Sequence, residues 1–428
     1  MNIGFLFYLK TTRNDLTKPE LGNPGIGGTQ FQMILLAHFL SKEKADWRIY
    51  CLTYNDMLLS ENLNFVKIGE NNLLETINNL QIDILVIAYS EFSKLQRLDL
   101  PKNLKIITRS GNDPDFVNLR WIVKNENVKA NIFVGKQQYD CHIDCDIIKK
   151  SKTIFNIIYD NVPDYVRNPD EQIVVYMGSL KKPKGFHILA RMWKSILKEV
   201  PKAKLYVLGS GKLYDSNAKL GKFNIAEERY ENEFMPYLLD KNRELLSSVT
   251  FFGIVGKEKY DIFSRCAVGV ANPSGCGETF CSTVLEMNCA KLPVVSINKF
   301  SLPDVVKNGE TGLLGNNKKQ IKKCIIRLLK NRELNLTLGE NAKQYVKNFS
   351  CQKIIPQWIE FFEQVQSGTF APKYEPPVPP FLNRHKWLCI MNRFLKLKIG
   401  LKFLPGLREM ITFAKSVGKF ILRKGELK

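Results

Sequence analysis

Two glutamates eight positions apart, Glu278 and Glu286, have the residue type and spacing that suggest chemistry. Glu278 follows a glycine-rich turn, Pro-Ser-Gly-Cys-Gly, at the end of a short apolar run. We expect a helix to begin near Cys281 or Ser282, with the hydroxyl of Ser282 or Thr283 as its cap. Carboxylates on both sides of such a helix start could accept hydrogen bonds from the hydroxyl groups of a ligand.

The spacing of the two glutamates suits one elongated ligand. At about 1.5 Å per helical residue, eight positions separate the carboxylates by up to ~12 Å, roughly the distance from the sugar ring to the ribose of a nucleotide sugar. Parallel α/β folds bind ligands at the carboxyl ends of their strands, where helix N-termini favour a diphosphate. The plainer alternative places Glu278 in a surface loop and Glu286 on a solvated helix face, and spacing alone does not exclude it.

The elements that must position these residues are strands and helices, which alternate in a β-α-β pattern in both halves of the chain. Short apolar runs alternate with helical patterns, which predicts two doubly wound, Rossmann-like α/β domains. The expected strands are residues 2–8, 47–54, 82–89, 104–110 and 130–136 in the first half, and 172–179, 203–210, 249–255, 267–273 and 292–298 in the second. Residues 30–40 and 185–200 have helical periodicity.

A polar, proline-bearing stretch near residues 164–171 marks the boundary between the two halves. A second such stretch, with five prolines, spans residues 371–380 and predicts an extended linker. The expected organisation is therefore an N-terminal domain (1–166), a C-terminal domain (167–349), a helix that packs back on the first domain (350–366), a proline-rich linker (367–380) and a basic tail (381–428).

The chain of 428 residues is strongly basic, with 63 basic and 42 acidic residues and a net charge of +21. Such a surplus favours anionic partners such as phosphorylated substrates or an anionic membrane surface. No nucleic-acid-binding module is recognisable, so nucleic acid is not expected as a partner. Ten cysteines without disulfide or zinc spacing, and no apolar run of ~18 residues, predict a cytoplasmic protein.

The tail holds a surplus of ten positive charges, nearly half of the total. In residues 408–423, Lys415, Lys419 and Arg423 share one helical face, while apolar residues such as Phe413 share another. A basic face beside an apolar face that carries aromatic residues is typical of a helix in a lipid headgroup layer. We therefore expect peripheral membrane association, although an ordinary amphipathic helix packed on the protein body has the same pattern.

Several motifs occur in the order seen in the retaining glycosyltransferases of family 4, and the sequence resembles that family over roughly residues 1–366. The motifs are GGTQ (27–30), YMGSLKKPKG (176–185), LYVLGSGKL (205–213), the unit 249–280 that leads to the paired glutamates, and LPDVVKNGETGLL (302–314). The resemblance is most specific in the second half. It implies the GT-B fold, in which two Rossmann-like domains face each other: the first binds the acceptor and the second the nucleotide sugar.

The resemblance also implies roles for individual residues. Glu286 would hold the ribose hydroxyls of the donor, and Glu278 the hydroxyls of the donor sugar. The amides of Phe280 and Cys281 would meet the sugar or the distal phosphate. Lys184 would pair with the diphosphate and balance the charge that grows as the nucleotide leaves. Other implied donor contacts are Gly27 and Gly28, which let the backbone approach the phosphates, Gly256 near the base, and Ser179 and Thr279.

The sequence departs from the family pattern at several of these positions. Ser179 stands where the family usually has an arginine, and Thr279 and Cys281 stand where glycines are common. On the acceptor side, Arg109 and Asn112 follow an expected strand where many members have a histidine. No Asp-x-Asp pair lies where a metal would bridge a diphosphate, so we expect neither a metal nor another cofactor.

These observations predict a retaining glycosyltransferase that moves a sugar from a nucleotide sugar to a hydroxyl acceptor. The acceptor would be a glycan or a lipid-linked precursor of a cell-surface polysaccharide or glycolipid. Two alternatives remain open. One is a sugar-nucleotide epimerase or a phosphorylase of the same architecture, and the other is a basic membrane-binding protein that keeps a vestigial pocket.

Overall fold

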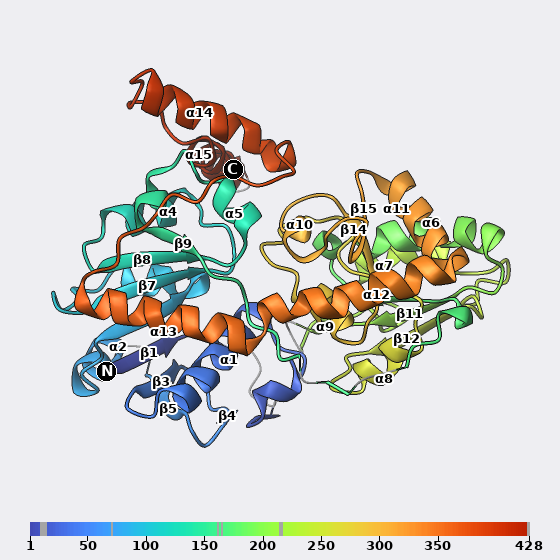
Figure 1. Ribbon diagram of the computed structural model, residues 1–428, viewed down its shortest axis with the longest axis horizontal. Helices are drawn as coiled ribbons and strands as arrows, with labels where there is room; N and C mark the ends of the chain where they lie inside the picture. Colours follow the sequence, from blue (N-terminus) through green and yellow to red (C-terminus); the bar gives the residue numbers. More distant parts are fainter. Residues whose placement is uncertain (9–14, 70–71, 161, 164–165, 214–216, 426–428) are drawn as a thin grey trace.

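Two α/β lobes form the structure and face each other (Figure 1). The computed structural model describes residues 1–8, 15–69, 72–160, 162–163, 166–213 and 217–425. Part of the expected domain boundary, residues 164–165, lies outside these ranges. Within them, each lobe contains one large parallel sheet, and the predicted α/β class is confirmed.

The sheet of the first lobe has seven parallel strands among the described residues, in the order β5-β3-β1-β6-β7-β8-β9. Its strands are β1 (Asn2–Leu6), β3 (Arg48–Thr53), β5 (Asn64–Lys67), β6 (Ile84–Ala88), β7 (Lys105–Ser110), β8 (Val128–Phe133) and β9 (Ser151–Thr153), and a separate short pair joins β2 (Asp15–Leu16) to β4 (Leu58–Leu59). Its helices are α1 (Gly28–Glu43), α2 (Leu73–Asn79), α3 (Phe92–Leu95), α4 (Phe116–Lys124) and α5 (Lys136–Asp140).

The sheet of the second lobe has six parallel strands in the order β12-β11-β10-β13-β14-β15, counted over the same described ranges. Its strands are β10 (Ile173–Met177), β11 (Lys204–Leu208), β12 (Val249–Gly253), β13 (Val268–Val270), β14 (Val294–Ile297) and β15 (Gly312–Gly315). Its helices are α6 (Phe186–Glu199), α7 (Glu228–Phe234), α8 (Lys259–Ser264), α9 (Ser282–Cys289), α10 (Leu302–Val305), α11 (Lys318–Lys330) and α12 (Arg332–Val346).

Each of the ten apolar runs interpreted as a strand overlaps one. These runs are apolar on both faces because helices cover both sides of a parallel sheet. Strands β5, β9 and β15 and the short pair of β2 and β4 were not predicted. β5 and β9 lie at the two edges of the first sheet, and β5 is largely exposed, so neither needs a continuous apolar run. β15 is buried, but it is only four residues long and two of them are glycines.

Helix α13 (Cys351–Ser367) returns to the first lobe after the chain has completed the second (Figure 1). Trp358, Phe361 and Phe362 are at most 2 % exposed and belong to the hydrophobic core that β1 and α1 share. The core of the first lobe is therefore completed by a segment from far along the chain.

The two lobes meet through apolar packing, for example of Phe155 on Phe280, and through polar contacts. The Thr279 hydroxyl donates to the carbonyl oxygen of Gly111 at 2.6 Å. The amide of Gln137, in α5, donates to the carboxylate of Asp304, in α10, at 3.0 Å. Thr279, which the family resemblance placed at the donor, thus forms part of the lobe interface.

The C-terminal segment folds onto the first lobe instead of extending away from it. In the proline-rich linker, Glu375 accepts a hydrogen bond from the amide of Thr153 at 2.7 Å. Two helices follow, α14 (Lys386–Lys398) and α15 (Leu407–Gly425), beside α4 and α5 (Figure 1). The description of side chains ends at Gly418, so Lys419 and Arg423 of the predicted basic face lie outside it.

The buried carboxyl of Asp304 should make the free energy of unfolding depend on pH. Burial raises the pKa of this carboxyl to about 7, and the hydrogen bond from the Gln137 amide only partly opposes the shift. Because the folded state binds this proton more tightly than the unfolded chain does, the stabilisation is complete at about pH 4 and is lost as the pH rises through 7. Each unit of pKa difference corresponds to about 1.4 kcal/mol. In denaturant titrations, the unfolding free energy of the wild type should fall more between pH 4 and 7 than that of Asp304→Asn. Equal slopes would contradict this assignment.

Candidate active site

A cleft between the lobes is lined by the ends of four strands of the second sheet. Residues 176–179, 208–209, 254–255 and 272 follow or end β10, β11, β12 and β13, and the start of α9 completes the wall. On the opposite side lie four residues of the first lobe, Asn23, Gly25, Ile26 and Gly28. The space between the protein atoms, counted together with the open mouth of the cleft, is about 940 Å³.

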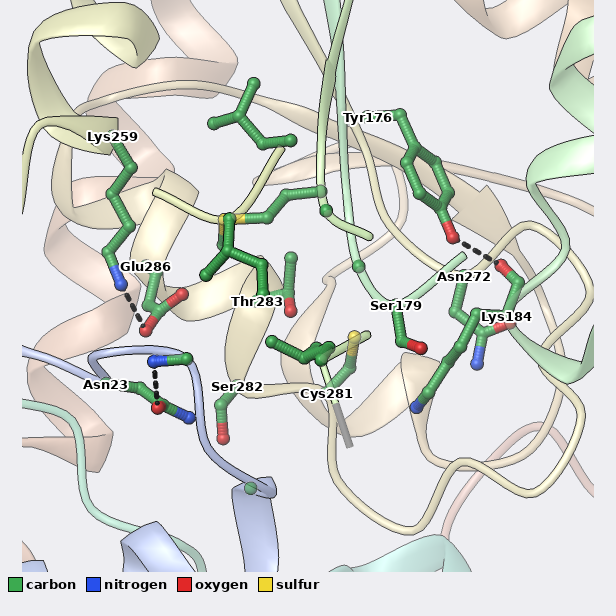
Figure 2. A pocket seen from close by; sticks show the side chains of 18 of the residues that line it. Asn23, Tyr176, Ser179, Lys184, Lys259, Asn272, Cys281, Ser282, Thr283 and Glu286 are labelled. Carbon is green, nitrogen blue, oxygen red and sulfur yellow. Dashed lines mark hydrogen bonds and ion pairs between the residues drawn. The ribbon is translucent and has the colours of Figure 1, made fainter. Parts of the chain in front are cut away.

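One end of the cleft is built around Glu278. Its Oε2 accepts a hydrogen bond from Asn272 Nδ2 at 2.8 Å and forms an ion pair with Lys184 Nζ at 2.8 Å. The carbonyl oxygen of Lys184 in turn accepts from the Tyr176 hydroxyl at 3.0 Å, which fixes the turn after β10 (Figure 2). Glu278 is 7 % exposed, so these two donors replace most of the water that an ionised carboxylate needs.

The other end of the cleft is built around Glu286 on α9. Its Oε1 forms an ion pair with Lys259 Nζ at 2.8 Å (Figure 2). Lys259 is the first residue of α8 and is 2 % exposed, so its charge is shielded from solvent. Each carboxylate of the cleft is therefore matched by one buried or half-buried lysine.

The loop before α1 closes over this second end. Asn23 Oδ1 accepts hydrogen bonds from the amides of Gly25 and Ile26 at 2.9 and 2.8 Å. Gly25 has φ +108°, and a Cβ there would lie 2.7 Å from the Ile254 side chain. A glycine is thus required where the first lobe meets the wall of the cleft.

Helix α9 begins between the two glutamates, as the sequence indicated. Its N-cap is Cys281, whose side chain makes no capping hydrogen bond, so the predicted cap by Ser282 or Thr283 is wrong. Both hydroxyl residues line the cleft instead (Figure 2). A helix start that faces the cleft without a side-chain cap leaves its amides available to a ligand, with the positive end of the helix dipole behind them.

Ser179 is the unusual residue at the end of the cleft that is built around Glu278. It is 1 % exposed, and its hydroxyl has no hydrogen-bond partner among the described residues. Its side chain lies beside Lys184 and Cys281 at the cleft (Figure 2). An unpaired buried hydroxyl costs about 1–3 kcal/mol, which a ligand that supplies a partner would recover.

The structure brings most of the candidate residues together. Those that line the cleft are Gly28, Ser179, Lys184, Glu278, Phe280, Cys281 and Glu286. Gly27 is the N-cap of α1, and neither it nor Gly256 or Thr279 is part of the lining. The roles predicted for all of these residues, inside the lining or outside it, stay predictions.

The acceptor-side candidates also lie outside the cleft lining. Arg109, at the end of β7, is 3 % exposed and donates through Nη2 to Asn156 Oδ1, and its Nη1 has no partner among the described residues. Burial lowers the pKa of Arg109 to about 10, so the guanidinium stays charged at neutral pH. Asn112 is exposed on the following turn.

Sequence reasoning missed Asn23, Lys259 and Asn272. Lys259 lies in the run Gly-Lys-Glu-Lys, where nothing distinguishes one lysine from its neighbour until α8 turns it inward. Asn272 directly follows β13 and precedes the glycine-rich turn, so its place at a strand end was a usable signal.

Comparison with known proteins gives a family match for the second lobe and a fold for most of the chain. The family model for glycosyl transferases group 1 matches residues 160–345. An uncharacterized glycosyltransferase of Methanocaldococcus jannaschii is 28% identical over 214 residues, which are 49% of this chain and 53% of that protein. The capsular polysaccharide biosynthesis glycosyltransferase CapM of Staphylococcus aureus is 25% identical over 194 residues, 45% of each chain. The chain spans about half the length of these curated relatives.

Solved structures share the fold over a larger part of the chain. HepE of Anabaena in complex with UDP and glucose has a TM-score of 0.61 and 16% identity, covering 85% of this chain and 100% of that one. Sucrose-phosphate synthase of Thermosynechococcus elongatus has a TM-score of 0.61 and 17% identity, covering 86% of this chain and 99% of that one. At these identities the likeness establishes the two-lobed architecture alone.

The ion pair between Lys259 and Glu286 should be measurable in a double-mutant cycle. Lys259→Met leaves a carboxylate at a site that is 8 % exposed, so we expect a loss of roughly 2–3 kcal/mol of unfolding free energy. Glu286→Gln in the same chain should recover at least about 1 kcal/mol of that loss. The exposed pair Lys67–Asp56, at 2.6 Å, is the control and should couple by less than ~1 kcal/mol. A coupling as weak as the control's would show that the two cleft residues are independent.

Proposed function

Since residues 160–345 match the family model for glycosyl transferases group 1, we propose that this protein is a glycosyltransferase. It moves a sugar from a nucleotide-sugar donor to a hydroxyl acceptor. The observation that carries the proposal is the cleft at the strand ends of the second lobe. It has one lysine-paired glutamate at each end and the start of α9 between them.

The nucleoside end of the donor binds near Glu286. A carboxylate with two oxygens can accept hydrogen bonds from both ribose hydroxyls, and Lys259 balances its charge at 2.8 Å. Ile254 and Val255, which line the cleft after β12, offer an apolar surface for the base. HepE, which shares the fold, is described with UDP and UDP-glucose, so a UDP-sugar is the first donor to test.

The diphosphate binds between the two glutamates. The amides at the start of α9 point toward the cleft, and Lys184 supplies a positive charge next to them. The hydroxyl of Ser179 can donate to a phosphate oxygen, which gives it the partner it otherwise lacks. Lys184, Ser179 and the amides together replace the arginine that the family usually has.

Glu278 orients the transferred sugar and does not attack it. Its Oε2 already accepts from both Lys184 and Asn272, and a carboxylate so neutralised is a weak nucleophile. We therefore favour front-face transfer. The bond between C1 and the phosphate oxygen breaks, the acceptor oxygen bonds to C1 on the same face, and the leaving phosphate takes the acceptor's proton. The anomeric configuration is retained.

The acceptor approaches from the first lobe, where Arg109 and Asn112 remain the predicted contacts. A relative named for capsular polysaccharide biosynthesis and the basic tail both support synthesis of a cell-surface polysaccharide or glycolipid at an anionic membrane. The acceptor is then a glycan or a lipid-linked intermediate.

Thermal unfolding with a panel of nucleotide sugars tests the donor site. A ligand at 100 times its Kd stabilises the folded state by about 2.7 kcal/mol, so the correct donor should raise Tm by several degrees. Glu286→Ala should remove this shift, while Glu333→Ala, an exposed glutamate of α12, should leave it unchanged. No shift with any nucleotide sugar, or an equal shift in both variants, would refute the donor site.

Release of free nucleotide only when an acceptor is present distinguishes a transferase from an epimerase, and the anomeric configuration of the product tests retention.

We expect transfer without a divalent metal. The positive groups beside the diphosphate are Lys184 and the start of α9, and they can balance the charge of the leaving group. Addition of EDTA should therefore change the initial rate by less than about twofold, whereas Lys184→Ala should lower it by at least ~100-fold. A rate that collapses in EDTA and returns with Mg²⁺ or Mn²⁺ would contradict this.

A further inference from the structure

The surface of the C-terminal hairpin, formed by α14, α15 and the turn between them, exposes an unusual amount of apolar side chain. Of the 23 large hydrophobic residues that are exposed among those described, 11 lie between residues 381 and 417. We call Met391, Phe394, Leu397, Ile399 and Phe403 the hairpin face, and these residues are between 50 and 79 % exposed. Such a concentration in 37 residues marks an interaction site.

The opposite side of the hairpin is firmly packed, so the exposed face is not that of a detached helix. Cys389 is 0 % exposed and belongs to a core cluster of the first lobe. Lys386, also fully buried, forms an ion pair with Asp140 Oδ2 of α5 at 3.0 Å. Asp144 Oδ2 accepts hydrogen bonds from Asn392 Nδ2 and from the amide of Leu407, each at 2.7 Å, and thereby joins both helices to the lobe.

The base of the hairpin is tied to the wall of the first lobe by two arginines. Arg384 and Arg408 both form ion pairs with Asp113 Oδ2, the latter at 2.6 Å. Burial would raise the pKa of Asp113, but the two guanidinium groups outweigh it and hold the pKa well below its usual range. Asp113 follows Gly111, whose carbonyl oxygen meets Thr279 of the second lobe. The hairpin is thus fixed close to the edge where the lobes meet.

The positive charge of the hairpin indicates which kind of partner its exposed face can bind. Lys398, Lys402 and Lys415 are exposed on the same hairpin, and residues 381–428 carry ten more positive than negative charges. Cores of protein interfaces are depleted in lysine, and a second copy of this chain would bring like charges together. At an anionic lipid surface, each nearby lysine contributes about 1 kcal/mol to the free energy of binding, and apolar side chains insert between the headgroups and the acyl chains. None of the described helices is long and apolar enough to cross a bilayer, so contact would be at the surface.

We propose that the hairpin face docks on an anionic lipid bilayer, with Phe394, Leu397 and Phe403 inserted and the three lysines at the headgroups. The contacts to Asp113 fix the orientation of the first lobe against the membrane. The part of the proposal that concerns the acceptor rests on the proposed function: a lipid-linked acceptor in that bilayer lies on the side of the first lobe.

Sedimentation with vesicles tests the hairpin face in the full-length protein. The vesicles contain either phosphatidylcholine alone or phosphatidylcholine with phosphatidylglycerol, and wild type should sediment with the second kind. The triple variant Lys398→Glu, Lys402→Glu, Lys415→Glu should bind at least tenfold more weakly, since three lysines contribute about 3 kcal/mol. The double variant Phe394→Asp, Phe403→Asp should also lose binding, which a purely electrostatic attraction would not predict.

A matched charge control is available on the second lobe. Lys318, Lys319 and Lys323 are exposed on α11, and their replacement by glutamate changes the net charge equally. This control should bind vesicles as the wild type does. Equal loss in both triple variants, no sedimentation of the wild type, or a dimer that Phe394→Asp, Phe403→Asp converts to a monomer would each overturn the proposal.

Donor-induced thermal stabilisation, measured in parallel, separates the two proposals. The hairpin variants should keep the full Tm shift with the nucleotide sugar, because their substituted residues lie outside the cleft lining. Loss of vesicle binding with an intact Tm shift supports the docking surface. Vesicle binding without any Tm shift in the wild type would leave docking intact and refute the donor site.

Discussion

The pairing of each cleft glutamate with one lysine is the interaction on which the rest of the site depends. Glu278 and Glu286 are both under 10 % exposed, and an isolated carboxylate at such a position would cost several kcal/mol. Lys184 and Lys259, each at 2.8 Å, make it possible to keep two negative charges at the edge of one sheet. The four side chains together carry no net charge.

This balance has a consequence for a ligand with a diphosphate. In the proposed donor complex, the phosphates would add negative charge next to Lys184, and the lysine would divide its interaction between Glu278 and the ligand. The start of α9 and the Ser179 hydroxyl would share the phosphate contacts, since both line the same cleft. Lys259 is too deeply buried beside Glu286 to take part, so the two lysines differ in role although their ion pairs have the same length.

The strands and the glutamate pair were predictable because they rest on local signals. Apolar runs identify buried parallel strands, and glycine-rich turns identify their ends. The burial of Lys259 and Lys386 was not predictable, because the sequence does not distinguish a buried lysine from a solvated one. Their ion-pair partners, Glu286 and Asp140, come close only in the folded chain. The cap of α9 was predicted wrongly for a related reason. Ser282 and Thr283 are good caps by type, but the helix begins one residue earlier and turns their hydroxyls to the cleft.

Helix α13 has a consequence for synthesis of the protein on the ribosome. Trp358 and its neighbours complete a core that begins with β1, yet about 350 residues separate the two in the chain. At a translation rate of 5–20 residues per second, the apolar side of the nascent first lobe stays uncovered for roughly 20–70 s. The second lobe can fold during that interval from contiguous sequence, whereas the first lobe closes only after helix α13 has been made. The part of the protein made first is therefore the part that matures last.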